Sequence, residues 1–131
     1  MTITREADYA MRIMALLSRN AQLMDAKEIA EGCDVPYRFT LKILRKLVCA
    51  GLAKSQRGVN GGYLLARPAE EILLPEIIEA IDGALVINRC ILEPALCGNT
   101  GVCKIQKHLI YAQKIFVSAL GEKTLAEILA D

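Results

Sequence analysis

The sequence predicts a mainly α-helical fold that contains one two-stranded hairpin. Hydrophobic residues make up 53% of the 131-residue chain, but aromatic residues only 5%. The apolar content is therefore Leu, Ile and Ala, which suits helices packed on helices. Hydrophobic residues recur at helical spacing towards both ends of the chain, and a glycine-rich turn separates two short apolar runs near its middle. The length is enough for one compact domain, or for a small domain with a helical arm.

Two helices are expected first. The first begins near Thr4 or Arg5, stops near Asn20, and has apolar residues at helical spacing: Tyr9, Ala10, Ile13, Met14 and Leu17. The second is shorter and begins after Asp25, which can cap a helix and has an acidic residue three positions later. It ends in the turn 32–35.

A third helix and a hairpin follow. Pro36 suits the first position of the helix because its fixed φ is already helical, and Gly51 suits its left-handed C-terminal cap. The face expected to point inward consists of Leu41, Leu44, Leu47 and Val48. Two short strands come next, at 52–55 and 63–66. The Asn-Gly step between them is the strongest short-range hairpin signal.

The rest of the chain alternates between helical and irregular segments. Residues 74–81 have helical spacing, whereas residues 84–103 have no regular period and contain three clustered cysteines. Helical spacing returns at Lys104 and continues towards Leu120. A capping box at 124–127 predicts a last short helix.

This order of elements is the layout of a winged helix-turn-helix, in which the third helix enters the DNA major groove and the hairpin lies over the backbone or minor groove. The charge distribution agrees. Residues 1–70 carry 11 Lys and Arg against 7 Asp and Glu, whereas residues 71–131 carry 5 against 8. The stretch 38–57 holds six basic residues and no acidic one. Such a stretch indicates a local nucleic-acid footprint, although solubilising charges would give the same run.

The candidate DNA contacts lie on the outer face of the third helix and at the root of the hairpin. Arg57 stands at that root, where an arginine can reach a guanine edge or a narrow minor groove. Thr40 and Gln56 are candidates for phosphate or base contacts. The full predicted set is Arg38, Thr40, Lys42, Arg45, Lys46, Gln56 and Arg57.

The five cysteines fall into two groups. An odd number without an export signal argues against a disulfide framework. Cys33 and Cys49 lie in helical patterns and are expected to act as packing residues. Cys90, Cys97 and Cys103 have gaps longer than those of most zinc sites, and loops of this size can wrap an iron–sulfur cluster. Spacing alone leaves reduced thiols or an occasional disulfide equally open, and does not separate iron from zinc.

Several classes of protein are not expected. Uncharged apolar runs such as 13–18 fall far short of the roughly 20 apolar residues of a membrane span. No signal peptide is evident, so we expect a cytoplasmic protein. An enzyme is also not expected, because there is no nucleophile–base motif and the glycines at 58, 61 and 62 lie in a hairpin rather than opening a helix.

The sequence resembles the family of winged helix-turn-helix iron–sulfur transcription regulators typified by IscR and NsrR. The similarity covers nearly the whole chain. A wing motif followed about 30 residues later by three cysteines is far more specific than either part alone. The matching segments are 3–10 (ITREADYA), 39–47 (FTLKILRKL), 50–52 (AGL), 55–65 (SQRGVNGGYLL) and the cysteine loop.

The resemblance implies a homodimeric bacterial regulator, expected to act as a repressor, that binds a palindromic operator on double-stranded DNA. It places the dimer interface on the helix 104–120 and assigns Arg57 as the wing arginine that reads DNA. It also assigns Cys90, Cys97 and Cys103 as ligands of a 2Fe-2S or 4Fe-4S cluster, which can be lost during purification.

Two positions depart from the IscR branch of the family. That branch has a histidine ligand three residues after the last cysteine, where this chain has Gln106. In the nitric-oxide-sensing branch a carboxylate of the partner subunit completes the site, and Asp8 falls at the matching position. The resemblance therefore implies Asp8 of the partner subunit as the fourth ligand, with Glu6 as a further possibility. Leu41 replaces a glutamate that tunes operator choice in IscR, so the operator is not expected to match.

The expected function is that of a sequence-specific DNA-binding regulator whose cluster senses redox, nitric oxide or iron status. Two alternatives remain: a cluster-free winged-helix regulator that senses through a cysteine thiol or small molecule, and a metal- or cluster-binding interaction module without specific DNA binding. The expected parts are a DNA-binding domain (1–83), a cluster loop (84–103), and a dimerisation helix with a C-terminal tail (104–131).

Overall fold

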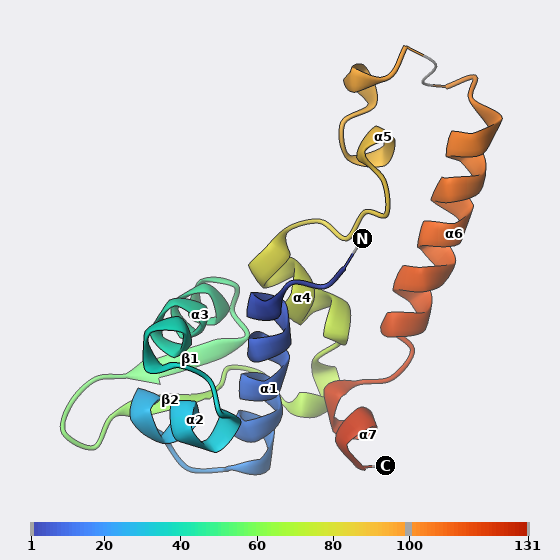
Figure 1. Cartoon of the computed structure of the whole chain (residues 1–131). Helices are drawn as coiled ribbons and strands as arrows, with labels where there is room; N and C mark the ends of the chain where they lie inside the picture. Colours follow the sequence, from blue (N-terminus) through green and yellow to red (C-terminus); the bar gives the residue numbers. More distant parts are fainter. Residues whose placement is uncertain (1, 99–100, 131) are drawn as a thin grey trace.

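The computed structural model describes residues 2–98 and 101–130 and shows a helical head from which an arm projects (Figure 1). The head consists of α1 (Arg5–Arg19), α2 (Ala26–Cys33), α3 (Tyr37–Cys49), β1 (Ala53–Gln56), β2 (Gly62–Leu65), the 3₁₀ turn η1 (Ala69–Glu71), α4 (Leu74–Asp82) and α7 (Leu125–Ala130). The arm consists of α5 (Arg89–Leu92), the 3₁₀ turn η2 (Pro94–Leu96) and α6 (Lys104–Leu120). The predicted mainly α-helical winged fold is confirmed.

Helix ends follow the capping residues in the sequence. The Thr4 hydroxyl accepts from the Ala7 N–H at 3.1 Å, and the Asp25 carboxylate accepts from the Glu28 N–H at 2.9 Å. The capping box before α7 is also present. Pro36 differs from expectation by one residue, because it occupies the N-cap of α3 and the helix begins at Tyr37.

A tight turn joins α2 to α3. Asp34 adopts a left-handed conformation with φ 55°, and the Val35 N–H donates to the Ala30 carbonyl at 3.0 Å. Gly51 ends α3 in a left-handed conformation with φ 75°, as its position in the sequence predicts. These two reversals place α3 against α2 and direct the chain into the hairpin.

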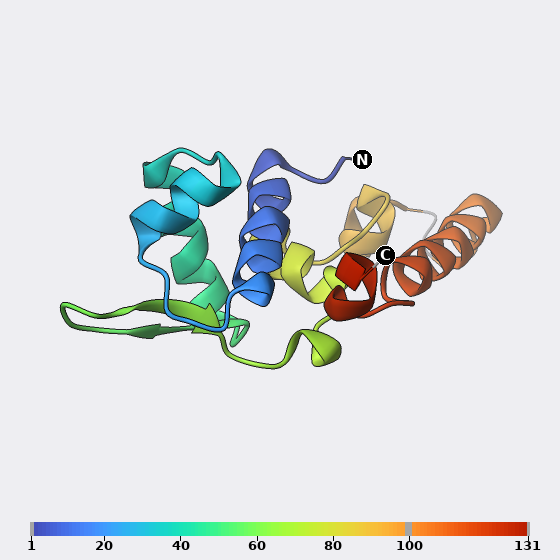
Figure 2. The same ribbon diagram turned by 90° about the horizontal axis from the view of Figure 1, so that it is seen from below.

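The hairpin, or wing, is antiparallel and runs in register from Ala53↔Leu65 to Gln56↔Gly62. A further bridge joins Tyr63 to Met24, the segment just before α2, with the Tyr63 N–H donating to the Met24 carbonyl at 2.8 Å. The root of the wing is therefore fixed to the helix-turn-helix, whereas its turn extends beyond the head (Figure 2).

The core of the head is formed by α1 and the elements around it. Its buried members come from α1–α4, the wing, η1 and α7: Ala10, Ile13, Met14, Leu17, Ile29, Ile43, Leu44, Leu47, Leu52, Ala53, Ala69, Ile72, Ile77 and Leu125. The inward face of α3 is rotated from the predicted one. Thr40 is 0% exposed and Leu41 is 36% exposed. The buried stripe of α3 begins at Thr40 and repeats after three, four and seven residues, so Leu41 lies about 100° around the helix from it.

The arm is attached to the head mainly at its ends. Among the described residues, none between 82 and 124 belongs to the core cluster. At the far end of α6 the Leu125 N–H donates to the Ile72 carbonyl at 2.7 Å, and within the arm the Ile87 N–H donates to the Gln113 side chain at 2.9 Å. Both views show α6 standing apart from the core (Figures 1 and 2). The short helices α5 and η2 lie in the stretch that the sequence left without regular structure.

Gly62→Ala should destabilise the protein and displace the wing. The added methyl carbon would lie 2.5 Å from the Met24 carbonyl oxygen, and overpacking of this kind costs about 1–3 kcal/mol. Denaturant unfolding measures the effect. Gly98→Ala is a matched control, because a methyl group there meets nothing within 4 Å. Equal free energies of unfolding for the two variants would contradict the close packing of Gly62.

Candidate nucleic-acid interface and cysteine loop

A groove between α3 and the wing brings together three of the predicted DNA contacts. Arg45 projects from α3, and Gln56 and Arg57 project from the wing; all three are exposed and line the same groove. Arg38 and Lys42 are also exposed. Arginine and glutamine side chains on the walls of one groove are suited to contact base edges and phosphates.

Thr40 is a wrong prediction for a DNA contact. Its side chain is fully buried, and its hydroxyl donates to the Pro36 carbonyl at 3.2 Å. The reason is the rotation of α3 described above, which turns Thr40 inward and Leu41 outward, where Leu41 lines the groove.

Two of the predicted lysines are directed towards α1. The Glu6 carboxylate accepts from the Lys42 ammonium at 2.7 Å and from the Lys46 ammonium at 3.2 Å. These two hydrogen bonds lower the pKa of Glu6 below its ordinary value, against a weaker opposing effect of burial. The sequence analysis did not predict these two ion pairs, because Glu6 lies 36 and 40 residues from its lysine partners in the chain.

The same surface carries apolar side chains that the charge pattern does not reveal. Tyr37, Phe39 and Leu41 of α3 are exposed, and Val59 at the tip of the wing is fully exposed. The Phe39 ring lies 6.2 Å from that of Tyr9 on α1. Exposed apolar groups beside basic ones suit contact with thymine methyl groups and sugars.

The two helical cysteines differ from each other. Cys33 packs against the core as expected, its thiol donates to the Arg12 carbonyl at 3.5 Å, and burial raises its pKa. Cys49, also predicted to pack, is instead exposed and lines the groove beside the wing. It lies about 180° around α3 from buried Thr40, on the face of the helix that points away from the core.

The three clustered cysteines lie at successive corners of the loop. Cys90 belongs to α5, Cys97 follows η2, and Cys103 is the N-cap of α6; each is half-buried. The Cys90 sulfur accepts from the Asn88 side-chain amide, and the Cys103 sulfur accepts from the Gln106 N–H, both at 3.5 Å. Residues 99 and 100 of this loop lie outside the described residues.

The donor set suits a thiolate-bound cofactor in its chemistry. N–H groups directed at sulfur stabilise thiolate ligands and tune the group that they hold. In the described parts of the chain, however, no three His, Cys, Asp or Glu side chains are gathered closely enough to hold one metal ion. A cluster would therefore need the cysteines to draw together.

Gln106 holds the two ends of the loop against α6. It is buried, its amide nitrogen donates to the Cys90 carbonyl at 3.0 Å, and its amide oxygen accepts from the Gly101 N–H at 3.4 Å. Sequence reasoning singled out this position only as the place of a missing histidine. The available signal was a polar residue in the first turn of the long helix, where its side chain can bond to the preceding loop.

Asp8 lies on α1 and is half-exposed. Its carboxylate pairs with the Arg12 guanidinium one turn along the helix, at 2.8 Å. A ligand role for Asp8 would require that carboxylate to exchange this partner for a metal.

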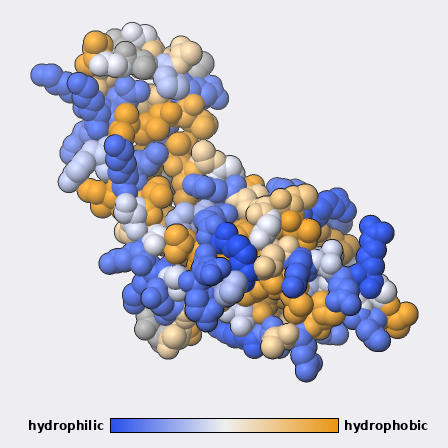
Figure 3. All heavy atoms as spheres, turned by 180° about the vertical axis from the view of Figure 1, so that it is seen from behind, coloured by the Kyte–Doolittle hydropathy of each residue, from blue (hydrophilic) through white to orange (hydrophobic). Residues whose placement is uncertain are grey.

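The outer face of α6 is apolar and exposed. Ile105, Tyr111 and Ile115 are each more than half exposed. Figure 3 shows hydrophobic surface along the arm. Tyr111 and Ile115 line a shallow hollow together with Lys114, Ser118, Ala119 and Glu122.

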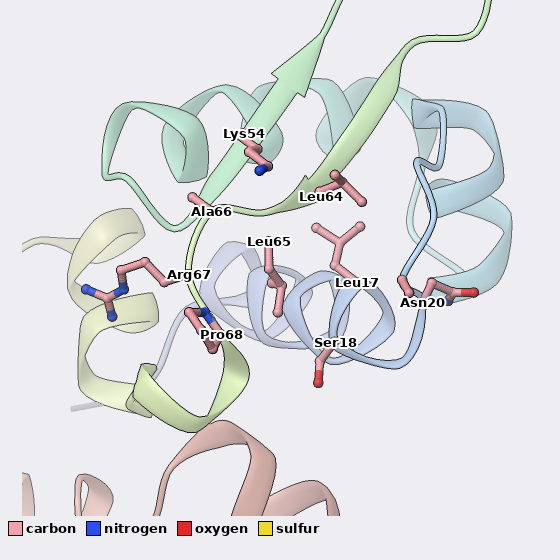
Figure 4. A pocket seen from close by; sticks show the side chains of 10 residues that line it. Leu17, Ser18, Asn20, Lys54, Leu64, Leu65, Ala66, Arg67 and Pro68 are labelled. Carbon is pink, nitrogen blue, oxygen red and sulfur yellow. The ribbon is translucent and has the colours of Figure 1, made fainter.

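Another hollow lies between the end of α1 and the root of the wing (Figure 4). Its charged lining residues are Lys54 and Arg67, and the Arg67 side chain is directed towards α4, where it pairs with Glu76 at 2.9 Å. The lining contains no carboxylate, histidine or cysteine. It therefore offers no carboxylate, imidazole or thiolate that would activate the Ser18 hydroxyl or the Lys54 amine as a nucleophile.

None of the helices within residues 2–98 and 101–130 combines the length and the apolar character that crossing a membrane requires.

Comparisons with known proteins agree with this geometry. The model of the Rrf2 family, described as iron-dependent transcriptional regulators, matches residues 3–131. Protein aau3 of Rhizobium meliloti (strain 1021) is 30% identical over 130 residues, which cover 98% of this chain and 84% of that protein.

Two solved structures have the same fold over nearly the whole chain. IscR of T. potens is 25% identical with a TM-score of 0.70, covering 100% of this chain and 88% of its own. The oxidised form of CymR from Staphylococcus aureus is 27% identical with a TM-score of 0.73, covering 98% and 96%. With the helix-turn-helix, the wing and the basic groove in place, we conclude that this chain belongs to the Rrf2 family of DNA-binding transcriptional regulators.

Proposed function

We propose that the protein is a homodimeric, sequence-specific regulator, acting as a repressor, whose operator binding depends on an iron–sulfur cluster. The observation that carries the DNA-binding part is the groove in which Arg45, Gln56 and Arg57 meet. In this proposal α3 enters the major groove, and the wing lies along the adjacent backbone or minor groove. On the operator, Arg38, Lys42 and Lys46 supply phosphate contacts, and the two lysines do so in exchange for their bonds to Glu6; buried Thr40 supplies none.

The exposed apolar face of α6 supports a dimer. The head does not bury the side chains of Ile105, Tyr111 and Ile115, because α6 stands away from the core. A second copy of the same helix would cover this face, and such an interface has two-fold symmetry. Two heads related by a two-fold axis would bind two half-sites of a palindromic operator.

Cys90, Cys97 and Cys103 would hold the cluster, with Asp8 of the partner subunit as the fourth ligand. The hydrogen bonds to two of the sulfurs support this assignment, as does the description of the family as iron-dependent. The cluster supplies a centre that oxygen or nitric oxide can attack. The chain's own part is to present thiolates and to hold the loop to α6 through Gln106.

The regulatory step is a change in the relative setting of the two heads. A ligand from the partner's α1 would tie each loop to the opposite head, and loss of the cluster would release that tie. DNA binding responds only to the extent that DNA favours one setting over the other.

A cluster-free regulator that senses through a cysteine thiol is the second candidate. The similarity to CymR in an oxidised form favours it, because oxidation there defines a separate state of a protein with this fold. The dispersed arrangement of the cysteines here also agrees with reduced thiols.

Arg57→Ala should weaken binding to a DNA site selected from a random library by about 1–3 kcal/mol, the value of a bidentate base contact. Binding to random-sequence DNA should change much less. Fluorescence anisotropy at fixed salt measures both. Arg89→Ala, which removes the same charge from the arm, should leave the preference for the selected site unchanged. Equal losses on both DNAs for Arg57→Ala would show that it contacts phosphate only.

Protein purified without oxygen should contain iron and acid-labile sulfide in equal amounts and absorb visible light. Cys90→Ser should lose most of both, because one of three thiolate ligands is removed. Cys49→Ser should keep them, since Cys49 lies in the head. Wild-type protein that stays colourless after anaerobic reconstitution would contradict the cluster and favour the thiol mechanism.

Ile115→Glu should convert the dimer to a monomer, because a charge in the centre of an apolar interface is costly unless it is paired. Sedimentation velocity measures the change in mass. Val59→Glu is the matched control: it places the same charge on another exposed apolar residue, at the tip of the wing. A wild-type monomer, or an Ile115→Glu dimer, would contradict the proposed interface.

A further inference from the structure

Glu6 stands among the basic residues of the candidate DNA surface. Its two carboxylate oxygens accept separately from Lys42 at 2.7 Å and Lys46 at 3.2 Å. The Glu6 side chain is 27% exposed, against 54% for Lys42 and 36% for Lys46. The carboxylate is thus the most enclosed group of the three. It faces α3 from the neighbouring helix.

Two features of the fold fix this arrangement. Lys42 and Lys46 are four residues apart, so they lie one above the other on α3 and one carboxylate reaches both. Glu6 lies in the first turn of α1, and hydrogen bonds from Thr4 to α4 fix the position of this turn. The Thr4 hydroxyl that caps this turn donates to Asp82 at the end of α4, and the Thr4 N–H donates to the same carboxylate at 3.3 Å.

The basic residues of the surface therefore fall into two groups. Lys42 and Lys46 are paired with Glu6, whereas in the described part of the chain no acidic side chain pairs with Arg38, Arg45 or Arg57. The arginines have the planar fork that reads base edges, and the lysines are point charges that attract any phosphate. On α3, the charges that would bind DNA regardless of sequence are the ones that Glu6 neutralises.

Stability does not account for the arrangement. Ion pairs open to solvent contribute little to folding, since water screens them and the long side chains lose freedom. A DNA phosphate, however, would compete with Glu6 for the same two ammonium groups, and the carboxylate would repel that phosphate.

We propose that Glu6 is a specificity-determining residue, which withholds Lys42 and Lys46 from the phosphates of non-cognate DNA and leaves discrimination to the arginines of the groove. This inference rests on the proposed DNA-binding function. Phosphate contacts position a protein without carrying sequence information, so weakening them raises the ratio of specific to non-specific affinity.

The test is the salt dependence of binding to a random-sequence duplex, compared between wild type and Glu6→Gln. Freeing two lysines should steepen the slope of log K against log salt by about 0.9 for each phosphate gained, towards about 2 in total. Affinity for this duplex should rise about tenfold at low salt. Glu79→Gln removes the same charge from an exposed position of α4 and should leave the slope unchanged.

A second variant keeps the inference testable should Glu6→Gln not fold. In the Lys42→Gln, Lys46→Gln double variant, loss of two masked lysines should change the slope on random DNA by less than about one phosphate equivalent. A slope that becomes shallower by about two phosphate equivalents would overturn the inference, because it would show that both lysines already bind phosphate in the presence of Glu6. Equal slopes for Glu6→Gln and Glu79→Gln would also overturn it.

The outcomes separate this inference from the function on which it rests. The random duplex needs no operator, so the comparison does not depend on finding one. Wild-type protein that binds no duplex at all would overturn the proposed function and the role of Glu6 together. Wild-type binding with an unchanged slope in Glu6→Gln would overturn the role of Glu6 alone.

Discussion

The buried face of α1 is the constraint on which the rest of the head depends. Ile13 and Met14 are fully buried, and α1 packs against α2, α3, α4, β2 and α7. Shortening one such side chain typically costs 2–5 kcal/mol in other proteins, because the cavity left behind closes only in part. Glu6 and Asp8 lie near the start of the same helix, about 200° apart around it, and Glu6 is the one directed at α3. The packing that stabilises the head therefore also sets where these carboxylates stand relative to α3.

The sequence was most informative where structure is local. The N-caps at Thr4 and Asp25, the wing and the extent of α6 all follow from residues close to one another in the chain. The inward face of α3 was not predicted correctly. Neighbouring residues point about 100° apart on a helix, so placing the face one residue late put Leu41 inward in place of Thr40. The pairing of Glu6 with α3 could not be foreseen either, because it joins segments that only the folded core brings together.

Gln106 ties the cysteine loop to α6 and occupies a position that bears on the fourth ligand of the proposed cluster. A neutral side-chain amide is a poor substitute for an imidazole, thiolate or carboxylate as an iron ligand, and both ends of this amide already bond to the backbone of the loop. At the position where the resemblance to the IscR branch would place a ligand, this residue instead joins two parts of the loop by hydrogen bonds. This arrangement supports a fourth ligand from elsewhere, in keeping with the proposed role of Asp8.

The separation of the arm from the core has an evolutionary consequence. Because no described residue between 82 and 124 joins the core cluster, substitutions and changes of loop length there leave the folding of the head largely untouched. Selection can then exchange one sensing chemistry for another without losing a working DNA-binding unit. The similarity to IscR and CymR extends over both the head and the arm, so this division is a feature of the shared fold.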